Sequence, residues 1–394
     1  MNFIENNEKY GIKYNLSKIR KLYNALEIPE EFNFVDFNRI EKNKYIIDLS
    51  ERSIGKTNAY LLLGMCFNKL YNAKICYLRN DGDSIKASTI SEIFNVIINY
   101  KDGLYIKKLT GGKYNTITYH WKAFYYAIAE NDKIVEKALE PFMYLMDVNE
   151  HEIYKSSFNV SNADIIIFDE FISKYYKYNT CYMFLDLVKT IIRDRKSPYI
   201  FMLANNTNIN STWFEELTIS KQIRHIKKGE QIDVVTERGT HFSVKLLENK
   251  SPTERKRHNN LFFGFNNPKL NAITGDGWSV EEVQHIYKDM EYEPISRLIF
   301  LRIAPNEFLS LQFAYYKDRK IMLVKRATKI KDDDIILTNS NIEEFKNCYY
   351  GLINDNFKKL VLKMIEQNNV YYSTNEVGAD FKSYVKYATS YRPF

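Results

Sequence analysis

The sequence contains little glycine, proline or cysteine, and it has no long hydrophobic run. Its 394 residues include 14 glycines, 8 prolines and 4 cysteines. Cys66, Cys76, Cys181 and Cys348 are far apart and do not form the paired spacing of a zinc site or a disulfide scaffold. We therefore expect buried thiols and a reducing, intracellular setting.

Signals for export or membrane insertion are also lacking. The start, MNFIENNEKYGIKYN, does not have the basic and then apolar profile of a signal peptide. Apolar runs such as IIIF at 165–168 are too short to span a bilayer, so we expect a soluble protein. The net charge of +7 is compatible with a polyanionic partner but does not require one.

Strand-like and helix-like segments alternate through the first half of the chain. Strands are expected at 45–49, 74–79, within 163–171 and at 199–206, and helices at 57–72, 84–100 and 180–195. This alternation predicts an α/β fold with a mostly parallel sheet covered on both faces. Gly111-Gly112, which separates two alternating runs, predicts a hairpin.

The second half of the chain has a different pattern. Strand-like stretches within 230–248 precede a polar, basic segment at 249–260. From about residue 261, several strand signals come first and helical segments follow, which is typical of a separate α+β domain. We expect an α/β domain at 1–215, a linker or lid region at 216–260, and a C-terminal domain at 261–394.

The stretch IIDLSERSIGKTNAYLLLG at 46–64 has the layout of a phosphate-binding loop between a strand and a helix. Ser50 stands where the usual pattern has glycine, which is acceptable if its φ stays negative. Lys56 would reach the β- and γ-phosphates of ATP, and Thr57 would bind Mg²⁺. The alternative is a turn capped by Gly55 with a solvated lysine. The expected nucleotide-binding loop comprises Ser50, Glu51, Arg52, Ser53, Ile54, Gly55, Lys56 and Thr57.

The run IIIFDE at 165–170 supplies the acidic half of such a site. Asp169 would hold Mg²⁺, directly or through water, and Glu170 would polarise the attacking water. Taken alone, two carboxylates that end a buried strand are more often only structural. The two motifs together, in this order, favour a P-loop nucleoside triphosphatase of the RecA-like type.

Three further polar residues complete the predicted site. Arg193 and Arg195 follow a helix and could stabilise γ-phosphate charge across a subunit boundary, although arginines there often only complement the helix dipole. Asn205 ends the next strand and could contact the γ-phosphate, with a turn-forming asparagine as the alternative.

With these motifs the chain resembles the DNA-packaging ATPases of small phi29-like tailed phages, which are relatives of terminase large subunits. The resemblance rests on ERSIGKT, with Arg52 four places before Lys56, and on IIIFDEF, TIIRDR and LANN. It implies that Arg193, rather than Arg195, acts in trans as an arginine finger. Residues 1–43 have no counterpart in this comparison.

The family resemblance implies an ATP-driven double-stranded DNA translocase that packages a viral genome into a procapsid. It implies a ring, expected to be a pentamer, at the portal vertex, and a packaging RNA as a further partner. The protein would act in the host cytoplasm, dock transiently at the portal, and be absent from the mature virion. The alternatives are another P-loop NTPase, of helicase or partition type, or a degenerate scaffold, which only Ser50 suggests.

The resemblance also implies a ribonuclease-H-like C-terminal domain that has lost its catalytic acids. RLIFLRIA has no carboxylate for the metal ions that such nucleases need, and the adjacent Asp332, Asp333 and Asp334 point in different directions. Basic candidates for nucleic-acid contact are Lys86, Lys107 and Lys108, the cluster at 255–257 and the segment 317–331, although such residues are more often a solvated face.

Overall fold

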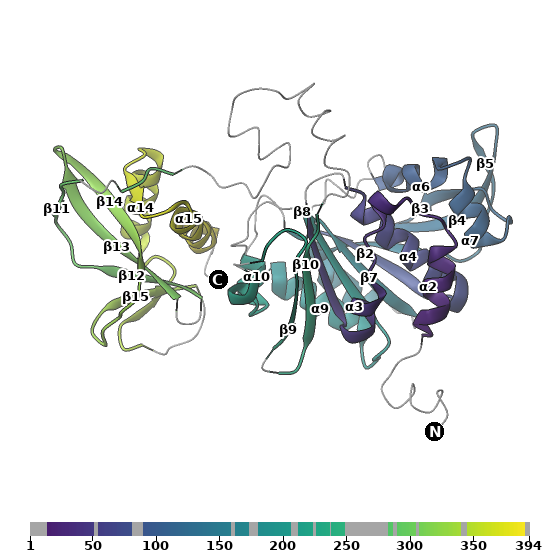
Figure 1. The fold of residues 1–394 in the computed structure, drawn as a ribbon, viewed down its shortest axis with the longest axis horizontal. Helices are drawn as coiled ribbons and strands as arrows, with labels where there is room; N and C mark the ends of the chain where they lie inside the picture. Colours follow the sequence, from purple (N-terminus) through teal and green to yellow (C-terminus); the bar gives the residue numbers. More distant parts are fainter. Residues whose placement is uncertain are drawn as a thin grey trace. The chain divides into compact units, whose positions relative to one another are not determined.

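The structure is a computed structural model that divides the chain into two compact units (Figure 1). Unit 1 comprises Met1–Ser173, Asn179–Asn205 and Ile226–Leu261, and unit 2 comprises Lys174–Tyr178, Asn206–His225 and Phe262–Phe394. The residues it describes are 14–50, 54–80, 90–158, 162–172, 180–205, 212–223, 226–236, 238–248, 283–286, 290–304, 307–339 and 345–390. No helix within these ranges combines the length and hydrophobicity needed to cross a membrane.

Unit 1 is built on a 10-stranded sheet with the order β3-β4-β6-β2-β7-β8-β1-β10-β9, and β5 pairs with β4. Six neighbouring strands in this order run parallel to one another: β6, β2, β7, β8, β1 and β10. The strand bounds are β1 Tyr45–Ser50, β2 Lys74–Arg79, β3 Thr116–His120, β4 Ala123–Glu130, β5 Lys133–Lys137, β6 Met143–Asp147, β7 Ala163–Asp169, β8 Tyr199–Asn205, β9 Gln231–Val235 and β10 His241–Leu246. The predicted α/β fold with a mostly parallel sheet is confirmed.

Helices cover both faces of this sheet, which explains why β7 is buried along its whole length. Ile165 belongs to the core beside α4, whereas the Phe168 ring stacks on Phe184 of α9. Because successive strand residues point to opposite faces, α4 and α9 lie on opposite sides of β7. The helices are α2 Leu16–Asn24, α3 Phe37–Lys42, α4 Lys56–Tyr71, α6 Asn95–Asn99, α7 Leu104–Thr110, α8 His151–Ser157 and α9 Thr180–Ile192, with short 3-10 turns η1 Glu30–Phe32, η3 Ser91–Phe94 and η4 Val148–Glu150.

Gly55 sets the start of α4. Its φ is 91°, a left-handed conformation that residues with a Cβ rarely adopt. The Phe32 ring also lies 2.8 Å from the position a Cβ would occupy at Gly55. The helix then runs to Asn72, where another left-handed residue ends it. The sequence requires glycine at 55 for both reasons, and the predicted helix at 57–72 is confirmed.

The hairpin predicted around Gly111-Gly112 is wrong. Both glycines have positive φ, but they end α7, a helix, instead of connecting two strands. The hairpin in this region joins β3 to β4, and its turn residues Trp121 and Lys122 both have left-handed φ. Lys107 and Lys108 are therefore in the last turn of a helix.

The structure differs from the linker or lid expected at 216–260. Within this region, β10 pairs in parallel with β1, with Tyr45 opposite Phe242, and β9 extends the sheet by one antiparallel strand. The short helices α10 Thr212–Glu216 and α11 Ser220–Ile223 belong to unit 2. The alternating strand signal was visible in the sequence, but the partner of β10 was not, because β1 lies almost 200 residues earlier.

Unit 2 contains a 7-stranded sheet with the order β16-β15-β12-β13-β14-β17, and β11 pairs with β13. Strands β12, β13 and β14 form an antiparallel meander, and β15 and β16 add in parallel beside β12. From β11 on, most strands precede the helices, which agrees with the α+β pattern that the sequence predicted for this part of the chain. The bounds are β11 Glu293–Pro294, β12 Ile299–Ala304, β13 Glu307–Tyr316, β14 Arg319–Ala327, β15 Ile335–Thr338, β16 Cys348–Tyr350, β17 Val370–Tyr372, α14 Asp355–Glu366 and α15 Asn375–Ser390.

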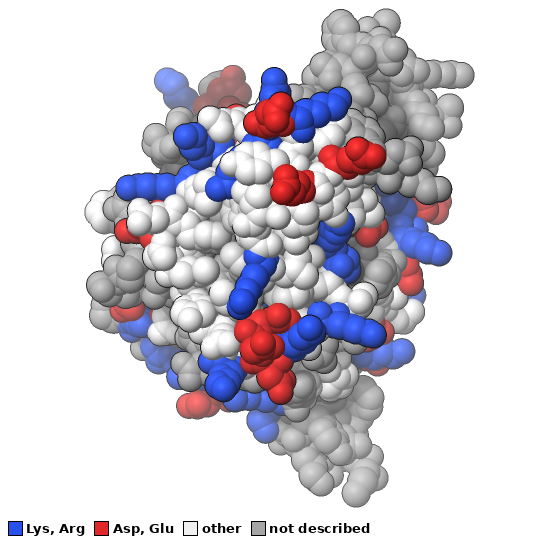
Figure 2. All heavy atoms as spheres, turned by 90° about the vertical axis from the view of Figure 1, so that its left-hand side faces the viewer, with Lys and Arg blue, Asp and Glu red and all other residues white. Residues whose placement is uncertain are grey.

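Figure 2 shows unit 2 from the side on which its strands lie in Figure 1. Charges of both signs are scattered around a broad uncharged area. Two basic residues of the segment 317–331 have partners within the unit: Lys325 Nζ donates to the Tyr292 hydroxyl at 3.0 Å, and Arg326 pairs with Asp380 at 2.7 Å. Among the described residues, this face therefore does not present the single-sign basic surface typical of phosphate-backbone binding.

Candidate nucleotide-binding site

The carboxyl ends of the parallel strands bring the predicted site residues together in unit 1. Ser50 at the end of β1 lies opposite Asn205 at the end of β8, and Asp169 ends β7, which is the next strand. Ligand sites in parallel sheets form at this edge, because the strands end there and the following loops and helix N-termini face the same space. A pocket of about 650 Å³ lies here, and its lining includes Gly55, Lys56, Thr57, Asp169, Glu170 and Asn205.

Lys56 and Thr57 already contact the ends of the neighbouring strands. Lys56 is 5% exposed, and its Nζ donates to Asn205 Oδ1 at 2.8 Å. The Thr57 hydroxyl lies 3.1 and 3.2 Å from the two carboxylate oxygens of Asp169. The lysine, the hydroxyl and the carboxylate that the sequence assigned to one site therefore occupy one side of one pocket.

Glu170 differs from Asp169 in both exposure and backbone conformation. Its side chain is 53% exposed, whereas that of Asp169 is 4% exposed. Its φ of 53° is left-handed, which costs a non-glycine residue about 1 kcal/mol or more and is often retained at functional sites. The Glu170 backbone N–H donates to Asp169 Oδ1 at 3.0 Å, which fixes the turn between the two carboxylates.

Arg79 is a site residue that the sequence analysis missed. It ends β2, beside β7, and its guanidinium contacts both carboxylates: Nη2 lies 3.3 Å from Asp169, and Nη1 donates to Glu170. Burial would lower the pKa of Arg79, but the adjacent Tyr77, Asp169 and Glu170 raise it, so this side chain stays charged. The sequence shows only an arginine at a strand end, and β2 was not known to neighbour β7.

Tyr77 is the second missed residue. Its hydroxyl donates to Asp169 Oδ2 at 2.6 Å, and burial together with the nearby Asp169 raises the pKa of this phenol well above its usual value. Asp169 thus accepts hydrogen bonds from Tyr77 and Thr57 as well as pairing with Arg79. A carboxylate with three such neighbours is held in one orientation.

Several predicted residues lie outside the described ranges or away from the pocket. Glu51, Arg52, Ser53, Lys86 and the cluster at 255–257 are outside the described residues. Ser50 is fully buried, whereas Ile54 lines the pocket and also packs with Phe34 and Leu247.

The two lysines of α7 differ from each other. Lys108 Nζ donates to the Ala25 carbonyl and to Glu27 at 2.8 and 2.9 Å, so it ties α7 to the end of α2. Lys107 is exposed.

Arg193 and Arg195 lie at the amino-end edge of the sheet, opposite the pocket. Arg195 pairs with buried Asp164 and donates to the Ala163 carbonyl at the start of β7. Arg193 is exposed, has a left-handed φ of 52°, and donates to the Phe158 carbonyl. Since Asp164 and Asp169 are five strand positions apart, this edge is about 17 Å from the carboxylates of the pocket.

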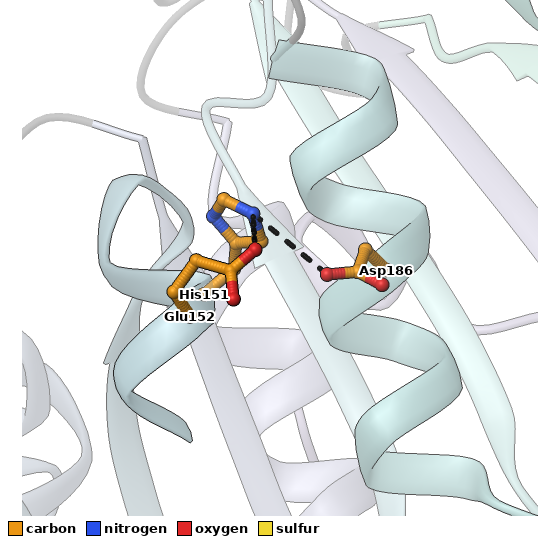
Figure 3. Close-up of side chains that lie close together, drawn as sticks. All are labelled: His151, Glu152 and Asp186. Carbon is orange, nitrogen blue, oxygen red and sulfur yellow. Dashed lines mark ion pairs between the residues drawn. The ribbon is translucent and has the colours of Figure 1, made fainter. Parts of the chain in front are cut away.

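A separate histidine and carboxylate cluster connects α8 to α9 (Figure 3). His151 Nε2 lies 3.3 Å from Glu152 and 3.7 Å from Asp186. Lys155 Nζ also contacts Glu152 at 2.8 Å and Asp186 at 2.7 Å, so its ammonium supplies positive charge to both carboxylates. The three side chains could hold a metal ion, but Lys155 already balances their charge, and we interpret the cluster as an ion-pair link between the helices.

Carboxylates in unit 2 are also paired or exposed. Asp380 of α15 is buried and pairs with Arg326, which also lies 3.5 Å from Glu307. The aspartates at 332–334 precede β15, and Asp334 accepts a hydrogen bond from the Lys331 N–H at 2.8 Å. The Arg326 guanidinium therefore lies between Glu307 and Asp380 and supplies positive charge to both carboxylates.

Comparisons with known proteins show similarity in fold. No protein-family model matches the sequence, and no curated protein matches it. A chain of the Phi-28 gp11 DNA packaging motor superposes with a TM-score of 0.53 at 17% identity, covering 92% of this chain and 100% of that chain. A chain of the bacteriophage Phi-29 viral genome packaging motor assembly gives a TM-score of 0.51 at 14% identity, covering 90% and 99%. Both units of this chain therefore share the fold of phage packaging-motor chains, as the sequence motifs predicted.

Proposed function

We propose that this chain is an ATPase that drives double-stranded DNA into a viral procapsid. The observation that carries the proposal is the convergence of Lys56, Thr57, Asp169, Glu170 and Asn205 on one pocket at the carboxyl edge of the sheet. The fold supports it, because two structures with this fold over nearly the whole chain are phage genome-packaging motors. Fold alone does not imply activity, so the pocket is the stronger support.

The residues present fit a Mg²⁺-bound triphosphate. The Thr57 hydroxyl and the Asp169 carboxylate are oxygen ligands of the kind that Mg²⁺ prefers, and they lie 3.1 Å apart. When bound, Mg²⁺ would neutralise charge on the β- and γ-phosphates. Lys56 would exchange its bond to Asn205 for a phosphate oxygen, which leaves the Asn205 amide to contact the γ-phosphate.

Glu170 would orient and polarise the attacking water. Its exposed carboxylate is adjacent to Asp169 and lines the same pocket. In the structure it is paired with Arg79, so the guanidinium must leave before the carboxylate can accept a proton from water. The ion pair therefore represents a state that is not ready for hydrolysis.

Arg193 would act on the ATP of a neighbouring subunit. It follows the end of α9 near the amino ends of the strands, the edge of the sheet away from the pocket, and it is exposed. Arginine suits this role because it stays charged and binds phosphate oxygens through a planar fork. Arg195 is engaged with Asp164 and instead holds the end of α9 in place.

The same proposal includes the partners that a packaging motor needs. These are a homo-oligomeric ring, expected to be a pentamer, with double-stranded DNA, the portal of the procapsid and a packaging RNA. The protein would work in the host cytoplasm and at the portal vertex, and would leave before the virion matures. Lys86 and Lys107 stay candidates for DNA contact, while Lys108 has partners within its own unit.

Unit 2 would have no nuclease activity. Strand β12 has no carboxylate, and Arg326 occupies the space between Glu307 and Asp380. A two-metal nuclease needs carboxylates that can accept metal ions in place of such a cation.

ATP hydrolysis measured with and without duplex DNA tests the proposed function. Hydrolysis that duplex DNA stimulates is expected. Hydrolysis that only single-stranded nucleic acid stimulates would favour the helicase alternative, and no hydrolysis under any condition would favour the degenerate scaffold.

A further inference from the structure

The pocket continues beyond the residues that would contact phosphates. Its further lining comes from two segments on either side of α4 in the sequence: Ile28, Pro29 and Phe32 before it, and Val96, Ile97, Tyr100 and Tyr105 after it. A volume of about 650 Å³ is typical of a site for a whole nucleotide. A triphosphate alone would leave this apolar part without a ligand.

Two large apolar side chains in this part are unusually exposed. Phe32 is 44% exposed and Val96 is 61% exposed, although both line the pocket. Ile97 and Tyr105, which line the same part of the pocket, are almost fully buried, so core packing holds this side of the pocket in place. A planar apolar group that enters here would remove both exposed side chains from water.

Phe32 also lies directly beside the phosphate-binding loop. Its ring lies against Gly55, at 2.8 Å from the position of an added Cβ. A group that contacts Phe32 is therefore next to the residue that begins the phosphate-binding helix. A nucleoside triphosphate whose phosphates bind at this helix start would therefore have its base within reach of Phe32.

Polar groups that could read a base are few among the described lining residues of this part. Tyr100 and Tyr105 stack on each other, with ring centroids 4.5 Å apart, and both pack against the core of unit 1. Asn58 follows Thr57 and lies beside the expected phosphates. A site without base-directed hydrogen bonds distinguishes ligands by shape and contact area, and it separates close isosteres poorly.

We infer that Phe32 and Val96 form a nucleobase subsite that binds purines by apolar contact and separates adenine from guanine only weakly. This inference rests on the proposed function, because the phosphates must be bound beside Gly55. It assigns a role to residues 28–32, which had no counterpart in the sequence comparison.

Titration calorimetry of the full chain with Mg²⁺ and a set of triphosphates tests the inference. ATP and GTP should bind within about tenfold of each other, and CTP, UTP and inorganic tripolyphosphate at least about tenfold more weakly than ATP. Val96→Ser should weaken the binding of ATP about threefold to tenfold and leave the affinity for tripolyphosphate unchanged. Val135→Ser is the matched control, because Val135 is 56% exposed on β5 and does not line this pocket.

The outcomes separate this inference from the function on which it rests. If tripolyphosphate binds as tightly as ATP, the phosphate site stands and the base subsite is wrong. If neither ligand binds, both are wrong. Equal losses of ATP affinity in Val96→Ser and Val135→Ser would also contradict the proposed subsite. A preference for ATP over GTP above about a hundredfold would contradict it as well.

Discussion

The guanidinium of Arg79 lies 3.3 Å from the Asp169 carboxylate, and its other terminal nitrogen donates to Glu170. In the proposed site, Arg79 would therefore compete with Mg²⁺ for Asp169 and with water for Glu170. Arg79→Met should lower the Mg²⁺ concentration that half-saturates ATP binding by about tenfold, because the competent state no longer requires an ion pair to break. Fluorescent-nucleotide binding across a Mg²⁺ series measures this midpoint.

Arg79→Lys is the matched control for that experiment. Lysine keeps the positive charge without the fork that reaches both carboxylates, so its midpoint should lie between those of the parent and Arg79→Met. A higher Mg²⁺ requirement in Arg79→Met than in the parent would show that Arg79 supports metal binding instead of competing with it.

Asp169 and Glu170 are expected to have separable roles. Glu170→Gln should bind Mg²⁺ and ATP like the parent but hydrolyse about 10²–10⁴-fold more slowly, because the amide cannot accept a proton. Asp169→Asn should instead weaken the Mg²⁺-dependent part of ATP binding. Parallel measurements of nucleotide affinity and turnover test this division, and equal losses of affinity in the two variants would contradict it.

Arg193 should act only across a subunit interface. On its own, Arg193→Ala should hydrolyse ATP about 10³–10⁵-fold more slowly than the parent, as an arginine-finger variant does. Mixing it with Glu170→Gln should restore part of the activity, because some interfaces then combine an intact Glu170 with an intact Arg193. Arg238→Ala, at an exposed arginine in the β9–β10 turn, should keep full activity alone.

Two results would change this interpretation of Arg193. Full turnover of Arg193→Ala alone would exclude it as the finger. If subunits exchange and mixing restores nothing, either the residue acts within its own subunit or the ring needs every site intact. Titration of the parent protein with each variant separates those two cases, because a ring that needs every site loses activity more steeply than in proportion to the variant added.

Lys44 should make the stability of the protein depend on pH. Its Nζ lies 4.1 Å from the centroid of the Tyr199 ring and has no hydrogen-bond partner among the described residues. Burial lowers the pKa of Lys44 to about 8. The folded state then binds fewer protons than the unfolded state between pH 8 and the ordinary lysine pKa near 10.4, so this residue makes stability rise with pH through that window.

Lys44→Met should remove that dependence. Below pH 8 the variant should be more stable than the parent by about 1–2 kcal/mol, and the difference should shrink as the pH approaches 10. Urea unfolding of both proteins at several pH values measures the difference in their free energies of unfolding. Because the other titrating groups are the same in both proteins, their effects cancel in this difference. A constant difference across this range would mean that Lys44 has an ordinary pKa in the folded protein.

The sequence predicted those parts of the site that local patterns encode. The strand, turn and helix around Gly55, Lys56 and Thr57 form a continuous signal, and Asp169 follows an unmistakable apolar run. Arg79 gave no such signal, because its role depends on β2 lying beside β7. Local sequence does not state which strands are neighbours.

The errors at fold level have similar physical causes. Glycine pairs with positive φ occur both in hairpin turns and at helix ends, so Gly111-Gly112 did not distinguish the two. The helical alternative was visible in the adjacent lysines of the last turn, Lys107 and Lys108, which suit a helix C-terminus. Likewise, β9 and β10 were visible as strands, but their pairing with β1 spans a long stretch of chain.

The most direct test of the account is the rate of ATP hydrolysis by Lys56→Ala in the presence of duplex DNA. Lys56 is the one lysine that lines the pocket among the described residues, and its Nζ is already placed between the phosphate loop and Asn205. Turnover should fall at least about 10²-fold, since a preorganised charge at the transferring phosphate is lost. Lys69→Ala, at an exposed position on the same helix, should hydrolyse ATP at the parent rate with the same thermal stability. Parent-level hydrolysis by correctly folded Lys56→Ala would contradict the assignment of this pocket as the ATPase site.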